Sequence, residues 1–218
     1  MTAVDVILPV LNEVGNLGWI IDRMPADFRP IVVDNGSSDG SGAFALERGA
    51  LVVNEAQRGF GSACWAGLQA ATADIVCFMD ADGSLDPAYL PRVVEPIGSG
   101  RADLVVARRL ADRGAWPLHT RLANRVLAAQ LNHRCRTSLH DLGPMRAARR
   151  LDLLNLGMTD RRSGWPLEMV VKAAKAEWTI VEVPVPYHRR RTGVSKETGT
   201  LAGTARAVKD MTAILRAM

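Results

Sequence analysis

The sequence predicts an α/β fold with a mostly parallel central sheet and helices on both faces. Short apolar strands alternate with helices through the first hundred residues. Such strands are typical of a parallel sheet that is buried between two layers of helices. At 218 residues, 48% of them hydrophobic, the chain is long enough for one domain with a sizeable core.

The first half alternates regularly. Strands are expected at residues 4–10, 31–34, 50–54, 75–79 and 104–107. Helices are expected at residues 15–24, 39–48, 61–73 and 87–97. The last of these helices has Pro87 in its first turn, where the missing N–H is tolerated.

The second half is less regular. Residues 116–132 are expected to form a long helix whose apolar side chains face the interior: Leu118, Leu122, Val126, Leu127 and Leu131. After an irregular segment at 141–145, helices are expected at 146–154 and 166–176, and an alternating strand at 179–187. An amphipathic helix at 200–218 is expected to pack on the sheet or on a second copy in a homodimer, or to lie on a membrane surface.

The composition narrows the class of ligand. A net charge of +4 suits phosphate-bearing ligands or an anionic membrane surface. Aromatic residues make up only 5% of the chain and no nucleic-acid-binding motif is present, so nucleic acid is not an expected partner. Three irregularly spaced cysteines indicate a reduced, cytoplasmic protein. No apolar run reaches the ~18 residues of a membrane span, so any membrane contact would be peripheral, on the inner face.

Polar residues follow each of the first four predicted strands. They are Asn12 and Glu13, the segment 34–39, Asn54 and Glu55, and the pair Asp80 and Asp82. Right-handed crossovers bring the carboxyl ends of parallel strands to one edge of the sheet, where such folds bind ligands. That edge lacks the Gly-x-Gly-x-x-Gly turn of nicotinamide-binding proteins, and residues 59–62 lack the lysine of a P-loop.

Asp80 and Asp82 are the strongest single signal. Hard oxygen ligands at this spacing suit Mg²⁺ or Mn²⁺, which usually keep part of their coordination shell for water and substrate phosphates. The alternative is a polar turn that closes a strand.

Four motifs occur in order along the chain: residues 9–13 (PVLNE), 33–39 (VDNGSSD), 80–82 (DAD) and 190–196 (RRTGVSK). As an ordered set they resemble the family-2 glycosyltransferases, and among them the dolichyl- or polyprenyl-phosphate sugar transferases. The resemblance implies a GT-A fold, an NDP-sugar donor, a divalent metal and inversion at the anomeric carbon. It implies one glycosyltransferase domain over 1–218, with a Rossmann-like donor half at 1–110 and a smaller acceptor half at 111–218.

The resemblance also implies residue roles. The residues that would bind the nucleotide sugar are Pro9, Asn12, Glu13, Asp34, Asn35, Asp80 and Ala81. Asp80 and Asp82 would hold the metal and the diphosphate, with Ser84 as a further metal contact. Arg109, Arg190 and Lys196 would face the phosphate of the donor or of the acceptor.

One residue departs from the family pattern, which has two aspartates after the second strand. Here the second is Asn35. An asparagine offers one acceptor and one donor, which fits a uracil edge better than the guanine edge that an aspartate would bind. We therefore expect a UDP-sugar more than a GDP-sugar.

The acceptor decides whether a general base is needed. A lipid phosphate is already ionised near neutral pH and needs cations to position it. A hydroxyl would need a carboxylate base, for which Asp141 and Glu168 are the candidates. Non-catalytic alternatives remain for these residues: Glu168 would be a carboxylate near a helix start, and the arginine run 189–191 would lie on a solvated face.

Two other functions compete with glycosyl transfer. They are a sugar-phosphate nucleotidyltransferase and a non-catalytic nucleotide-binding protein.

Overall fold

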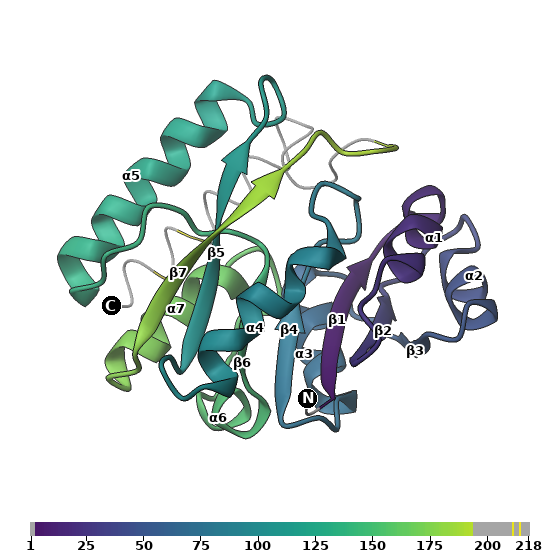
Figure 1. Ribbon diagram of the computed structural model, residues 1–218, viewed down its shortest axis with the longest axis horizontal. Helices are drawn as coiled ribbons and strands as arrows, with labels where there is room; N and C mark the ends of the chain where they lie inside the picture. Colours follow the sequence, from purple (N-terminus) through teal and green to yellow (C-terminus); the bar gives the residue numbers. More distant parts are fainter. Residues whose placement is uncertain (1–2, 194–210, 212–213, 215–218) are drawn as a thin grey trace.

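The computed structural model describes residues 3–193, 211 and 214, and its centre is a seven-stranded sheet (Figure 1). The strands are β1 (Val4–Val10), β2 (Phe28–Asp34), β3 (Leu51–Asn54), β4 (Ile75–Phe78), β5 (Leu104–Ala111), β6 (Arg146–Arg149) and β7 (Ile180–Tyr187). Their order is β3-β2-β1-β4-β6-β5-β7, and only β6 runs antiparallel to its neighbours. The predicted mostly parallel α/β sheet is confirmed.

Helices cover both faces of the sheet, as predicted. The helices are α1 (Val14–Asp22), α2 (Ser41–Glu47), α3 (Phe60–Ala70), α4 (Leu90–Gly98, after the short 3-10 turn η1, Pro87–Tyr89), α5 (Leu118–Cys135), α6 (Arg150–Asn155) and α7 (Trp165–Lys175). Successive side chains of β1 point to opposite faces of the sheet and belong to two hydrophobic cores. Val6 and Leu8 pack with α1, α2 and α4, whereas Ile7 packs with α3, α6 and α7.

The helix predicted at 146–154 is wrong in its first half. Residues 146–149 form β6, whose Ala147 pairs with Cys77 of β4 on one side and with Val105 of β5 on the other. Alanine and arginine favour helix locally, but both neighbouring strands would lose their hydrogen-bond partners without this strand. Only residues 150–155 continue as helix.

The prediction for the apolar residues of α5 is also partly wrong. Leu131 is buried, but Leu118, Leu122 and Val126 are 81%, 63% and 52% exposed. No other element of the described chain covers this side of the helix. The terminal helix expected at 200–218 lies outside the described residues. The exceptions are Met211 and Ile214, which pack against the core that contains Ile7 and the buried residues of α7.

No helix in residues 3–193 combines the length and the apolar character that a bilayer crossing requires.

Gly143 is the position where the chain before β6 meets β5 most closely. A Cβ atom there would overlap the backbone carbonyl of Ala107, which cannot move aside without breaking the sheet. We expect Gly143→Ala to lower the free energy of unfolding by about 3 kcal/mol, at the upper end of overpacking effects. Gly98→Ala is the matched control, because a Cβ at the end of α4 meets nothing within 4 Å. Urea unfolding of both variants checks this, and equal stability would contradict the close contact.

Candidate active site

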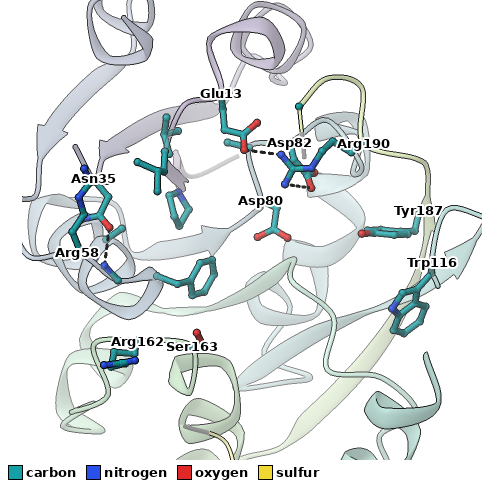
Figure 2. Close-up of a pocket in the computed structure, with 18 of the residues that line it drawn as sticks. Glu13, Asn35, Arg58, Asp80, Asp82, Trp116, Arg162, Ser163, Tyr187 and Arg190 are labelled. Carbon is teal, nitrogen blue, oxygen red and sulfur yellow. Dashed lines mark hydrogen bonds and ion pairs between the residues drawn. The ribbon is translucent and has the colours of Figure 1, made fainter. Parts of the chain in front are cut away.

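A cavity of about 980 Å³ opens at the carboxyl ends of β1, β2 and β4 (Figure 2). The strand order reverses at β1: β2 and β3 follow on one side of it, and β4 lies on the other. Open α/β sheets bind ligands at such a point. Charged residues of both signs line the cavity: Glu13, Arg58, Asp80, Asp82, Arg162 and Arg190. Of the predicted strand exits, those after β1, β2 and β4 line the cavity through Glu13, Asn35, Asp80 and Asp82, whereas Asn54 and Glu55 after β3 do not.

Asp80 and Asp82 both reach the cavity from the end of β4. Asp82 is held by the turn that follows it, since its Oδ1 accepts hydrogen bonds from Ser84 N (2.9 Å) and Ser84 Oγ (2.5 Å). Ser84 itself is fully buried. Its hydroxyl thus orients Asp82 and does not line the cavity as the predicted metal contact would.

Arg190 connects two of the acidic strand exits. Its Nη1 donates to Glu13 Oε1 (2.7 Å), and its Nη2 lies 3.1 Å from Asp82 Oδ2. Figure 2 shows this guanidinium between the two carboxylates. Burial opposes its charge, but the hydrogen bond to Glu13 and the charges of Asp82, Glu13 and Asp80 raise the pKa of Arg190. Of the run 189–191, this arginine enters the cavity, while Arg191 packs over the ring of Trp19 at 4.7 Å.

The wall proposed for the nucleoside is only partly formed by the predicted residues. Pro9, Asn35 and Ala81 line the cavity. Asn12 and Asp34 are not among its lining residues. They hold the turn after β2, where Asn12 Oδ1 accepts from Ser38 N and Asp34 Oδ1 from Ser37 N.

Asn35 has a structural task that its sequence position did not reveal. Its Nδ2 donates to the carbonyls of Glu55 (2.9 Å) and Gln57 (2.8 Å), and its Oδ1 accepts from Gly59 N (2.8 Å). The side chain is 6% exposed. The hydrogen bonds of this amide thus stabilise the loop 55–59. The structure therefore does not support the expectation that Asn35 pairs with a uracil edge.

Arg109 and Asp141 form a buried ion pair beside the cavity. Asp141 accepts from the backbone N (2.8 Å), the Nε (2.9 Å) and the Nη2 (2.6 Å) of Arg109. The guanidinium also lies 3.7 Å from the ring centroid of Trp116. Burial opposes the charge, but the hydrogen bonds and charge of Asp141 raise the pKa of Arg109. Asp141 is committed to this pair and does not line the cavity, which does not support its role as a general base.

Glu168 lies away from the cavity. Its carboxylate accepts from Thr159 N, Thr159 Oγ1 and Asp160 N and pairs with Lys172. Burial opposes its charge, but these contacts, Lys172 first, lower the pKa of Glu168. A carboxylate with a lowered pKa and saturated oxygens is a poor base, so the structure does not support this candidate either. Lys196 lies outside the described residues.

Several lining residues were not predicted. Arg58, Phe60, Trp116, Arg162, Ser163 and Tyr187 come from loops and element ends. Tyr187 ends β7 on the side opposite Asn35 (Figure 2). Burial, then Asp82 and Asp80, raise the pKa of its phenol. The basic Arg58 and Arg162 carry no local sequence signal, because their loops approach the site only in the folded chain.

The donor set at the rim suits a divalent ion that shares its shell with a ligand. No group of three or more His, Cys, Asp or Glu side chains able to hold a metal is present among the described residues. Asp80 and Asp82 provide hard oxygens at the cavity wall, and Mg²⁺ typically takes one or two carboxylates plus substrate phosphates and water. The two aspartates fit such an ion.

The free energy of unfolding tests whether Arg109 and Asp141 compensate each other's buried charge. Removing one partner leaves a buried charge without compensation, so we expect Asp141→Ala to lower the free energy of unfolding by about 3–5 kcal/mol. Replacing both residues by apolar ones, as in Arg109→Met with Asp141→Leu, removes both charges and should cost clearly less. Chemical denaturation measures both variants. A double variant as unstable as the single one would argue against the pair.

The lowered pKa of Glu168 predicts that the free energy of unfolding depends on pH. Because its pKa is lowered in the folded state, its contribution is present above its ordinary value of about 4.3 and is lost as the pH falls through the lower folded pKa. We expect Glu168→Gln to be less stable than the parent by about 1–3 kcal/mol at pH 7, with the gap shrinking below pH ~4. Glu47→Gln, at an exposed site on α2, is the control. A gap that persists unchanged at low pH would be inconsistent with the lowered pKa.

Comparisons with known proteins agree with this geometry. The family model described as glycosyl transferase family 2 matches residues 5–156. An uncharacterized glycosyltransferase of Mycobacterium tuberculosis is 46% identical over 95% of both chains. A polyprenol monophosphomannose synthase of Mycolicibacterium smegmatis is 29% identical over 89% of this chain and 81% of its own.

A solved structure shares the fold. The glucosyl-3-phosphoglycerate synthase of Mycobacterium tuberculosis, in complex with Mn²⁺, UDP and glucosyl-3-phosphoglycerate, superposes with a TM-score of 0.77. The match covers 99% of this chain and 80% of that one at 24% identity. The predicted GT-A fold is thereby confirmed. The family match and the relatives establish the enzyme class: the chain belongs to glycosyl transferase family 2.

Proposed function

We propose that this glycosyltransferase moves a hexose, with inversion, from a UDP- or GDP-linked sugar to the phosphate of a polyprenyl phosphate. The observation that carries the proposal is the cavity at the strand exits, where Asp80 and Asp82 lie beside the cation Arg190. The name of the polyprenol monophosphomannose synthase relative supports the acceptor class.

In this proposal Asp80 and Asp82 hold a Mg²⁺ or Mn²⁺ ion together with the donor diphosphate. Such an ion acts as a Lewis acid that stabilises the negative charge on the departing diphosphate. Pro9, Glu13, Asn35 and Ala81 form the wall on which the donor lies. Arg58, Arg162 and Arg190 add positive charge around the phosphates.

The surroundings of the carboxylates support a phosphate acceptor over a hydroxyl. The two candidate bases, Asp141 and Glu168, are both committed to buried contacts outside the cavity. Among the described lining residues the remaining carboxylates are Glu13, Asp80 and Asp82. A lipid phosphate needs no proton removed, so this arrangement suits it. Residues 1–110 would bind the donor and 111–218 the acceptor.

Asp82→Asn tests the metal-diphosphate role. We expect release of nucleoside diphosphate from the donor sugar to fall by a factor of about 100 or more, because a bound ion supplies several kcal/mol of charge stabilisation. Asp74→Asn is the control, since this exposed aspartate precedes β4 at the opposite end of the same strand. Both are assayed with Mn²⁺ and with UDP- and GDP-sugars. Equal rates for the two variants would remove Asp82 from the site.

The acceptor is tested in the same assay with undecaprenyl phosphate and, separately, 3-phosphoglyceric acid. Sugar transfer to the lipid phosphate supports the proposal. Transfer to phosphoglyceric acid alone would leave the enzyme class intact and overturn the proposed acceptor.

A further inference from the structure

Helix α5 has apolar side chains on two opposite sides. On the inner side, Ala128 and Leu131 are buried, and the helix contacts α7. On the outer side, Leu118, Leu122 and Val126 are exposed. These three follow one another at intervals of four residues, so they form one stripe along the helix. We call them the outer stripe.

Positive charge accompanies the outer stripe. Residues 113–136 contain five arginines and no aspartate or glutamate. Five positive charges in this segment exceed the net charge of +4 carried by the whole chain. Arg121 and Arg125 are exposed and lie three residues after Leu118 and Leu122, which places them next to the outer stripe.

The outer stripe begins next to residues that line the active-site cavity. Ala115, Trp116 and Pro117 line the cavity, and α5 starts at the next residue. Figure 1 shows α5 at the border of the molecule, at the far end of the sheet from β3. A surface in contact with the outer stripe would therefore lie directly beside the cavity.

We propose that the outer stripe, with Arg121 and Arg125, docks the enzyme on the surface of an anionic phospholipid bilayer. An interfacial helix of this kind buries its leucines at the acyl boundary, while its arginines contact anionic headgroups. The inference rests on the proposed function, because docking here places the cavity beside an acceptor phosphate at the membrane surface.

A second copy of this chain is a poorer occupant of the same face. A two-fold symmetric contact places equivalent residues of the two copies near one another. Across the outer stripe that would bring arginines against arginines, with no acidic residue in 113–136 to pair with them. An anionic surface satisfies both the apolar residues and the charges.

Co-sedimentation with lipid vesicles tests the docking. We expect the full chain to bind vesicles of equal parts phosphatidylcholine and phosphatidylglycerol, to bind pure phosphatidylcholine weakly, and to be released by high salt. Arg121→Gln with Arg125→Gln should weaken binding about 25-fold, from about fivefold for each cation near an anionic leaflet. Leu118→Ser with Leu122→Ser should weaken it at least about tenfold through lost apolar burial.

The matched control is Leu46→Ser with Leu151→Ser. These leucines are 66% and 61% exposed, on α2 and α6, and their substitution should leave vesicle binding unchanged. All variants change exposed residues, and unaltered thermal unfolding shows that each is folded. Equal binding by the stripe and control variants, or no binding of the parent to the anionic vesicles, would overturn the proposal. So would a dimer in sedimentation equilibrium that the stripe variant abolishes.

Two assays separate this inference from the proposed function. If the parent chain failed to bind anionic vesicles but still transferred sugar to detergent-solubilised undecaprenyl phosphate, the docking would be overturned and the proposed function would stand. Vesicle binding that depends on the outer stripe, without transfer to any lipid phosphate, would support the docking and overturn the acceptor.

Discussion

The architecture of the cavity depends on one ionic contact, the guanidinium of Arg190 between Glu13 and Asp82. A parallel sheet brings its strand exits to one edge, and here three of the residues gathered there are acidic. Like charges at such short range would repel one another and raise the cost of keeping them ionised. A cation supplied from 177 residues further along the chain relieves this repulsion. The contact thereby connects the segment after β7 with the segment after β1.

The part of the sheet formed by β5, β6 and β7 is organised around a second buried pair, Arg109 and Asp141. β6 inserts antiparallel between β4 and β5, and the segment just before it carries Asp141 to Arg109. Trp116 then stacks on the same guanidinium and starts the turn into α5. This arginine of β5 thus connects the segment before β6 with the turn into α5. The ion pair with Asp141 and the ring of Trp116 offset the cost of burying this charge.

The fold of residues 1–110 could be predicted well from the sequence, because the signals there are local. Each of the first four strands is an apolar run that ends in polar residues, and the positions of Asp80 and Asp82 follow from that pattern. β6 could not be predicted, since Arg-Ala-Ala-Arg has no strand signal and is a strand only because β4 and β5 need a partner. Helical periodicity predicts which apolar residues of α5 share a face, but it does not show whether another element covers that face. The structural roles of Asp141 and Glu168 could not be predicted, because they depend on contacts that form only in the folded chain.

The conformation of one part of the cavity wall depends on whether residue 35 is an asparagine or an aspartate. The amide nitrogen of Asn35 holds two main-chain carbonyls, those of Glu55 and Gln57. An aspartate at this place, the residue that the family resemblance leads one to expect, differs by a single NH₂-to-oxygen exchange. It would face those carbonyls with a second negative oxygen and could hold neither. In this chain an aspartate at position 35 would therefore leave the loop 55–59 without two of the hydrogen bonds that fix its path along the cavity.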